Sequence, residues 1–126
     1  MNIPKELKYT KTHEWVKLID EKTATIGITD FAQHNLGNIV FVNIQGEGSK
    51  LEIGDNLADI ESVKAVSDVF SPVAGIISKV NNDLQDAPEL FNDAPYDSWI
   101  VEISAITDMQ DLLSAEEYEE LVEKEA

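Results

Sequence analysis

The apolar residues of this chain come in short runs, and Gly, Asp or Asn residues separate the runs at intervals of about ten residues. Apolar and polar residues alternate within many of these runs, which is typical of half-buried β-strands. Several short strands in a chain of 126 residues fit a sandwich or a flattened barrel around one core. The sequence therefore predicts a mainly β fold in which residues 1–126 form a single domain.

The expected strands cover residues 14–20, 23–28, 38–44, 56–63, 66–71, 74–80 and 98–103. The strand 38–44 has apolar residues on both faces, which indicates a central position in a sheet. Thr29 can cap a short connecting helix that ends near Gly37, and Ser114 with Glu117 forms a capping box for a C-terminal helix. Four aromatic side chains are expected in the core: Trp15, Phe41, Phe70 and Trp99.

The charge and composition exclude several classes of function. Acidic residues number 25 against 9 basic ones, a net charge of −16, so nucleic acids and anionic membrane surfaces are not expected partners. The absence of cysteine and the presence of 2 histidines predict no metal site. No apolar stretch approaches the length of a membrane span, and the N-terminus lacks the features of a secretory or transit signal. We expect a cytoplasmic monomer.

Residues 59–69 are nearly a palindrome about Lys64 and Ala65. The expected pairs are Val63 with Val66, Ser62 with Ser67, and Glu61 with Asp68. Such a segment predicts two strands folded back on each other with Lys64 at the tip. Two-residue hairpin turns favour glycine, so this tip was selected for something other than its turn propensity. An exposed lysine there can be acylated to carry a prosthetic arm, and an ordinary surface lysine is the alternative.

The residues around this lysine resemble the domains that carry lipoate or biotin on a hairpin. The matching residues are Gly54, Leu57, Glu61–Ala65, Ser71–Pro72 and Gly75. Biotin carriers have Met on both sides of the lysine, and the lipoyl domains of 2-oxo acid dehydrogenases usually have Asp where Val63 stands. Both alternatives fit this segment less well.

A longer set of motifs resembles the glycine cleavage system H protein family. They are Tyr9–Val16, Gly27–Gln33, Leu36–Val42 and Glu61–Gly75, supported by Pro88–Leu90, Pro95–Tyr96 and Trp99. The resemblance covers nearly the whole chain. It implies a barrel-sandwich hybrid fold, with a short helical connector and a C-terminal α-helix, and lipoate joined by an amide bond to Lys64.

The resemblance also implies a non-catalytic carrier whose arm is visited by three enzymes. A pyridoxal phosphate-dependent glycine decarboxylase loads an aminomethyl group, a tetrahydrofolate-dependent aminomethyltransferase removes it, and a dihydrolipoyl dehydrogenase containing FAD reoxidises the dithiol. A lipoate ligase or a lipoyl/octanoyl transferase attaches the arm. A chain without cysteine needs its sulfur atoms from such a group.

A carrier that shelters an aminomethyl cation needs a partly dry cleft with a carboxylate that accepts its N–H bonds. The candidates are Thr12, Glu14, His34 and Asp68. Glu61 and Asp68 are alternatively recognition residues for the ligase. For each of them the ordinary interpretation is a solvated surface side chain.

Two other functions stay open from the sequence. An enzyme could use Lys64 as a Schiff-base nucleophile, which requires a buried amine and conflicts with a hairpin tip. A lipoyl carrier could also serve another pathway or pass lipoate to 2-oxo acid dehydrogenase subunits.

Overall fold

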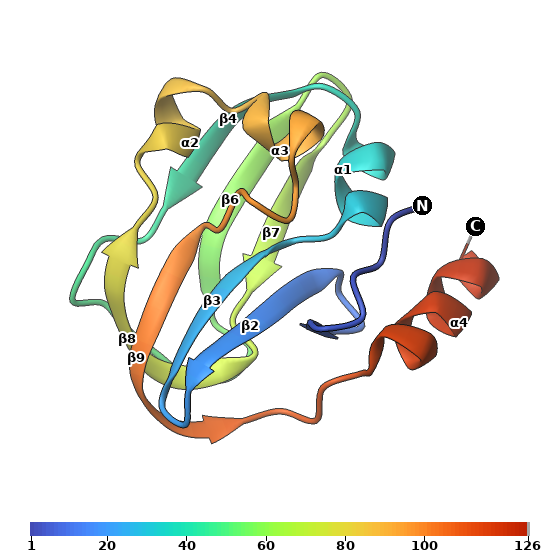
Figure 1. The fold of residues 1–126 in the computed structure, drawn as a ribbon. Helices are drawn as coiled ribbons and strands as arrows, with labels where there is room; N and C mark the ends of the chain where they lie inside the picture. The colour runs from blue at the N-terminus through green and yellow to red at the C-terminus, as the bar shows by residue number, and fades with distance from the viewer. Residues whose placement is uncertain (126) are drawn as a thin grey trace.

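The computed structural model describes residues 1–125 and has two antiparallel sheets (Figure 1). The larger sheet has the order β1-β2-β3-β9-β8-β5 and the smaller one the order β4-β6-β7. The strands are Lys8–Tyr9 (β1), Glu14–Asp20 (β2), Thr23–Ile28 (β3), Ile39–Ile44 (β4), Lys50–Leu51 (β5), Asn56–Ser62 (β6), Val66–Phe70 (β7), Val73–Val80 (β8) and Val101–Met109 (β9). The helices are Asp30–Leu36 (α1), Asp83–Asp86 (α2), Leu90–Asp93 (α3) and Ala115–Glu125 (α4). The expected mainly β class is confirmed.

The main core lies between the two sheets. Ile26 and Ile103 come from the larger sheet, Leu57 and Ile60 from the smaller one, and all four are buried in one hydrophobic cluster. The strand β6 therefore turns one face inward to this core, and the opposite face of the smaller sheet is open to solvent.

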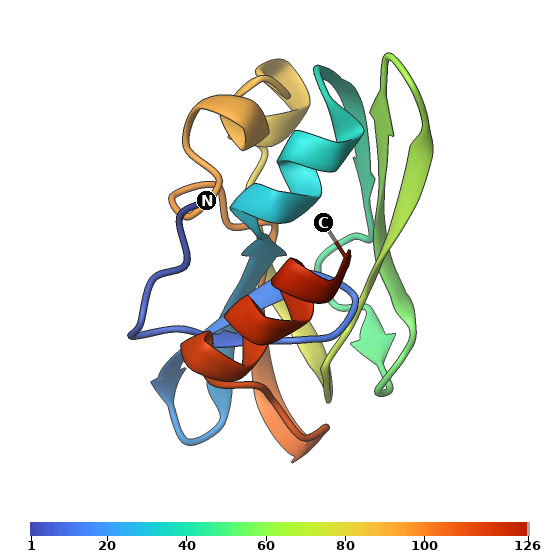
Figure 2. The same ribbon diagram turned by 90° about the vertical axis from the view of Figure 1, so that its right-hand side faces the viewer.

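A second apolar cluster attaches α4 to the body of the molecule. Tyr118 stacks on Tyr9 with ring centroids 4.6 Å apart, and Trp15 and Phe31 belong to the same cluster. Figure 2 shows α4 and α1 on one side of the molecule, with the β6–β7 hairpin beside them. The end of α1 lies against the tip of this hairpin, since Lys64 lies over Gly37, whereas α4 packs near β1.

The predicted caps of the helices are confirmed. The Ala32 N–H donates to Thr29 Oγ1 at 3.2 Å, and the Gly37 N–H closes α1 by donating to Gln33 O at 3.0 Å. At α4 the Ser114 N–H donates to Glu117 Oε1 at 2.9 Å, and the Glu117 N–H donates to Ser114 Oγ at 3.2 Å. These bonds satisfy amide groups that a helix end otherwise leaves free.

Two predictions about the smaller sheet are wrong. The strand β4 lies at an edge of this sheet rather than at its centre. Its register shifts between Ile39 and Phe41, and Phe41 is 51% exposed. Phe70 is also 36% exposed, so neither phenylalanine belongs to the core as expected. The outer face of this sheet therefore carries aromatic side chains.

The structure also differs from the expected elements after β8. The short helices α2 and α3 follow it, and β9 begins at Val101 instead of residue 98. The strand β9 continues to Met109 through Ala105, whose φ is 51° at a bulge opposite β8. Within residues 1–125, every helix is too short or too polar to cross a bilayer.

Candidate functional site

Lys64 is exposed in the connection between β6 and β7. Glu61 pairs with Val66 and Asp59 pairs with Asp68, so Val63 and Lys64 form the tip. The expected pairing of Glu61 with Asp68 is therefore wrong by two residues. A shift of two residues keeps each side chain on its predicted face, because side chains in a strand alternate with a period of two.

Ser62 stabilises the turn at the tip, which has no glycine. The Ser62 N–H donates to Ala65 O at 2.8 Å, and Ser62 Oγ accepts bonds from the Lys64 and Ala65 N–H groups at 3.2 and 3.1 Å. In residues 1–125, positive φ outside glycine occurs at His13 and Ala105, so the tip needs no left-handed residue. A serine side chain thus replaces the glycine of an ordinary two-residue turn.

The segment that follows α1 supports the tip from below. The Val63 N–H donates to Asn38 O at 3.0 Å. The aliphatic part of Lys64 lies over Gly37, where an added Cβ would be 3.1 Å from Lys64 Cε. Asn92 in α3 fixes this segment, since its amide donates to Gly37 O at 2.9 Å and accepts from the Ile39 N–H at 3.0 Å. The aliphatic part of the Lys64 side chain therefore packs against Gly37, and Asn92 of α3 holds Gly37 in place.

Glu14 forms a second polar cluster, and it is 2% exposed. Its Oε1 accepts bonds from Thr10 Oγ1 at 2.6 Å and Thr12 Oγ1 at 2.5 Å, and the Phe70 N–H lies 3.4 Å from Oε2. Burial raises the pKa of Glu14 above its ordinary value, and the hydrogen bonds from Thr10, Thr12 and Phe70 offset part of this rise. The ion pair found among residues 1–125 is elsewhere, so this carboxyl group is buried without a cation.

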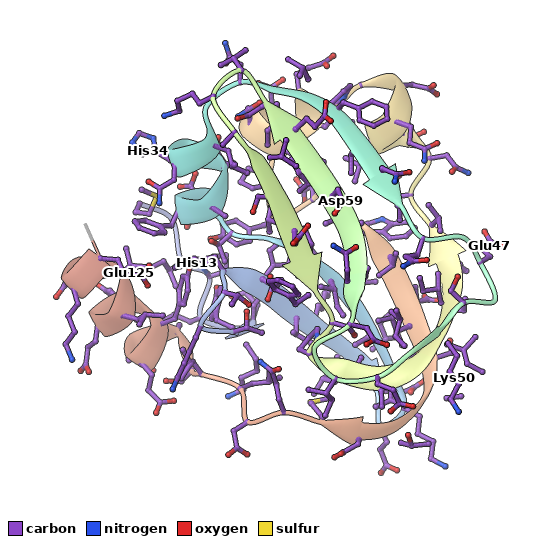
Figure 3. All side chains as sticks on the ribbon, turned by 180° about the vertical axis from the view of Figure 1, so that it is seen from behind. His13, His34, Glu47, Lys50, Asp59 and Glu125 are labelled. Carbon is purple, nitrogen blue, oxygen red and sulfur yellow. The ribbon has the colours of Figure 1, made fainter. Side chains whose placement is uncertain are left out.

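The turn between β1 and β2 brings the two threonine hydroxyls to Glu14. His13 has a φ of 72° in this turn, a conformation that few residues other than glycine adopt. Its Nδ1 lies 2.8 Å from Tyr118 Oη and its Nε2 lies 3.1 Å from Glu125 Oε1, and Figure 3 shows His13 and Glu125 side by side. The His13 carbonyl accepts from the Thr29 N–H at 3.1 Å. Both α1 and α4 thus hold the turn in place.

A groove of about 570 Å³ opens beside Thr12 and Phe70, and Leu112 and Leu113 form part of its wall. This volume lies in the range of small-molecule sites. Phe70 lies six positions after Lys64, at the end of β7, which corresponds to about 20 Å of extended chain. A lipoyl-lysine side chain with a one-carbon amine at its end extends about 17 Å by standard bond geometry. The end of such an arm comes within about 3 Å of the level of Phe70, whose N–H lies 3.4 Å from Glu14 Oε2.

The other predicted site residues lie at the surface. Asp68 faces Asp59 across β6 and β7, and a hydrogen bond with Asp59 raises the pKa of Asp68, followed by burial and by the Asp59 charge. Glu61 is exposed on β6, and His34 is exposed on α1 (Figure 3). The structure therefore joins Thr12 and Glu14 in one cluster and places Glu61 and Asp68 on the hairpin.

Comparisons with known proteins identify the family of this chain. The family model described as "Glycine cleavage H-protein" matches residues 7–125. A glycine cleavage system H protein of Lachnoclostridium phytofermentans is 54% identical over 125 residues, which cover 99% of this chain and 98% of that protein. The chain belongs to the glycine cleavage H-protein family.

Further relatives support the family and the fold. The glycine cleavage system H protein of Coprothermobacter proteolyticus is 46% identical over 97% of this chain and 98% of its own length. The crystal structure of a glycine cleavage system H protein from Mycobacterium marinum superposes with a TM-score of 0.86 at 33% identity, covering 92% of this chain and 95% of that one. The family expected from the sequence and its barrel-sandwich hybrid fold are confirmed.

Sequence reasoning missed three residues that shape the site. Thr10 is buried against Glu14 because the turn at residues 11–13 folds the chain back at this point, and period-two strand spacing does not reveal such a contact. Gly37 and Asn92 act on the tip through contacts distant in sequence. Nothing in the local sequence of Asn92 indicates this role.

Proposed function

We propose that this chain is a lipoyl carrier of the glycine cleavage system and that Lys64 is the attachment residue. The observation that carries the proposal is the position of Lys64, exposed at the tip of a hairpin that Ser62, Asn38 and Gly37 hold in one conformation. A rigid and exposed amine is accessible to a modifying enzyme. A Schiff-base enzyme would need the opposite environment for this lysine.

Attachment is an acyl transfer. The unprotonated Nζ of Lys64 attacks the carbonyl carbon of an activated lipoyl or octanoyl group, an amide bond forms, and the activating group leaves while the nitrogen loses a proton. A lipoate ligase or a lipoyl/octanoyl transferase supplies the activated acyl group. In the proposed function, residues 1–126 act as one non-catalytic carrier domain.

The attached group would supply a disulfide that can accept an aminomethyl group. The proposed partners are a pyridoxal phosphate-dependent glycine decarboxylase, a tetrahydrofolate-dependent aminomethyltransferase and a dihydrolipoyl dehydrogenase that contains FAD. The chain provides the shelter between visits by these enzymes. Glu14 would accept N–H bonds from a cationic amine at the end of this arm, because it is a buried carboxyl group that forms no ion pair within residues 1–125. The Thr12 and Thr10 hydroxyls orient this carboxyl group.

The remaining predicted residues have supporting roles. Asp68 and Glu61 flank the tip and are assigned to recognition of the arm or of the enzyme that attaches it. A role for His34 rests on its position on α1 and stays a prediction.

The test is intact and peptide mass spectrometry of the chain after reaction with a lipoate ligase, lipoate and ATP. We expect a gain of about 190 Da, one eight-carbon dithiolane acyl group, on Lys64. The gain should vanish in Lys64→Ala and persist in Lys79→Ala, which removes another exposed lysine. An unmodified Lys64, in a reaction that lipoylates an established carrier, would contradict the proposal.

A further inference from the structure

The outer face of the smaller sheet carries exposed apolar side chains beside Lys64. We call this surface the hairpin face and define it by Phe41, Asp59, Glu61, Val63, Val66 and Asp68. Figure 3 looks onto the smaller sheet from this side, with Asp59 near the middle. The face is continuous with the tip that holds Lys64.

The strand register places these side chains in two rows. Phe41 faces Glu61 across β4 and β6, and Glu61 faces Val66 across β6 and β7. Opposed residues of antiparallel strands project to the same side, so Phe41 and Val66 lie about 10 Å apart with Glu61 between them. The next row contains Asp59 and Asp68. The apolar row is therefore the one nearer to the tip.

These apolar residues are far from buried. Phe41 is 51% exposed, Val66 is 66% exposed and Val63 at the tip is 67% exposed. The solvent face of an antiparallel sheet is ordinarily polar, and single exposed apolar side chains need no explanation. Three of them around one lysine form a patch, and such patches mark interaction surfaces.

The charged side chains of the hairpin face are all acidic, and the uncharged Asn43 lies opposite Asp59 on β4. Glu61, Asp59 and Asp68 supply three carboxyl groups, and no ion pair involves them among residues 1–125. Apart from Lys64, the hairpin from Asn56 to Phe70 contains no lysine. A complementary partner therefore presents an apolar contact surrounded by basic side chains.

The position of the patch selects the partner. An enzyme that acylates Lys64 must bring a reactive carbonyl carbon to about 3 Å from Nζ, so its surface necessarily covers the residues one strand away from the tip. The enzymes that act on a finished arm meet its end about 15 Å from the lysine Cα and can bind elsewhere. The modifying enzyme is thus the partner whose reaction lies nearest to Val63 and Val66.

We propose that the hairpin face is the docking surface for the enzyme that acylates Lys64, with Phe41 and Val66 as its apolar anchors and the three carboxyl groups as contacts for basic side chains of that enzyme. This inference rests on the proposed function and names the partner of its attachment site.

The experiment measures initial rates of lipoylation of the unmodified full-length chain by a lipoate ligase with lipoate and ATP, followed by intact mass. Phe41→Ser and Val66→Ser are compared with Ile19→Ser, which removes a side chain of similar exposure, 53%, from β2 in the other sheet. Thermal melting of each variant verifies the fold. We expect the KM for the chain to rise about tenfold or more in the two hairpin variants with kcat nearly unchanged, and to stay at the wild-type value in Ile19→Ser. Added salt should raise the wild-type KM.

The same variants, lipoylated to completion with excess ligase, are then tested as substrates of glycine decarboxylase. We expect wild-type rates there. An unchanged KM for lipoylation, or an equal rise in Ile19→Ser, would overturn the docking proposal. A defect confined to the decarboxylase step would overturn it too, because the face would then belong to that enzyme. In each of these outcomes wild-type Lys64 is still lipoylated. The docking proposal can therefore fail while the proposed function stands.

Discussion

Lys64 and Glu14 lie at opposite ends of β7 and have opposite environments. Lys64 is exposed, and backbone groups and one serine hydroxyl hold its turn, whereas Glu14 is 2% exposed and two threonine hydroxyls hold its carboxyl group. The lysine is built for access by other proteins. The side chains packed around the Glu14 carboxyl group keep water away from it.

In the proposed function, this difference lets one side chain meet several enzymes and still protect a labile cargo. The proposed arm has an accessible attachment point at Lys64, and the buried Glu14 carboxyl group lies near Phe70, about 20 Å along the strand. Access and protection are therefore controlled by different residues. Substitutions should affect one without the other.

The strongest test of the buried end is Glu14→Gln. The substitution keeps the shape but removes the charge that accepts N–H bonds from an aminomethyl cation. Hydrogen bonds to charged groups contribute about 1.5–3 kcal/mol, so spontaneous loss of formaldehyde and ammonia from the loaded protein should become about ten- to a hundredfold faster. Release is measured by mass spectrometry over time, and lipoylation of Lys64 serves as the control that should not change. Equal rates of release from both proteins would contradict the proposed role of Glu14 in binding the aminomethyl cation.

Asn92→Ala tests the support of the exposed end. The Asn92 amide bonds Gly37 O, the Ile39 N–H and Gln33 Oε1, and loss of these bonds should cost about 1–3 kcal/mol of stability. We expect a lower Tm and faster hydrogen exchange at the Val63 amide. Asn82→Ala is the matched control, since Asn82 is exposed and its side chain forms no capping bond. Wild-type exchange at Val63 would show that α3 does not support the tip.

A smaller effect is expected for Ser62→Ala. The change removes the hydroxyl that accepts from the Lys64 and Ala65 N–H groups, and an exposed bond of this kind contributes about 0.5–1.5 kcal/mol. Hydrogen exchange at the Lys64 and Ala65 amides should accelerate, while exchange at Phe70 should not. Ser67→Ala provides the comparison in β7, where the hydroxyl forms one long bond of 3.5 Å. Equal exchange in both variants would contradict the assigned turn.

The weakest effect concerns pH. Burial raises the pKa of Glu14, so the folded protein binds more protons than the unfolded chain at pH values between the ordinary and the raised pKa. The free energy of unfolding therefore falls as pH rises through this window, and Glu14→Gln lacks this contribution. Urea unfolding from about pH 4 to about pH 8 should show the variant gaining stability relative to wild type as pH increases. The raised pKa of Asp68 is present in both proteins and cancels. A constant difference would contradict the raised pKa.

The sequence predicted the elements that depend on local pattern. The alternation in β2 and β3, the caps at Thr29 and Ser114 and the position of Lys64 at a tip all depend on neighbouring residues. The palindrome predicted a hairpin but gave the wrong register. The Ser62 side chain forms three hydrogen bonds in the turn, and pairing residues of similar type does not reveal these bonds.

The remaining features depend on contacts that no local pattern records. Phe41 has the pattern of a core residue, yet the register shift in β4 turns it to solvent. Asn92 supports the tip from 28 positions away, and the burial of Glu14 depends on packing by α1 and α4 around its turn.

The central claim is that one arm connects the exposed lysine to the buried carboxyl group. Amide spectra of the unmodified, the lipoylated and the aminomethyl-loaded protein, recorded by nitrogen–proton NMR, test it directly. We expect lipoylation to shift the Lys64 and Ala65 signals, and loading to shift Thr12, Glu14 and Phe70 in addition. Loading that leaves the Glu14 and Phe70 signals unchanged would contradict the claim, because the arm would then end elsewhere.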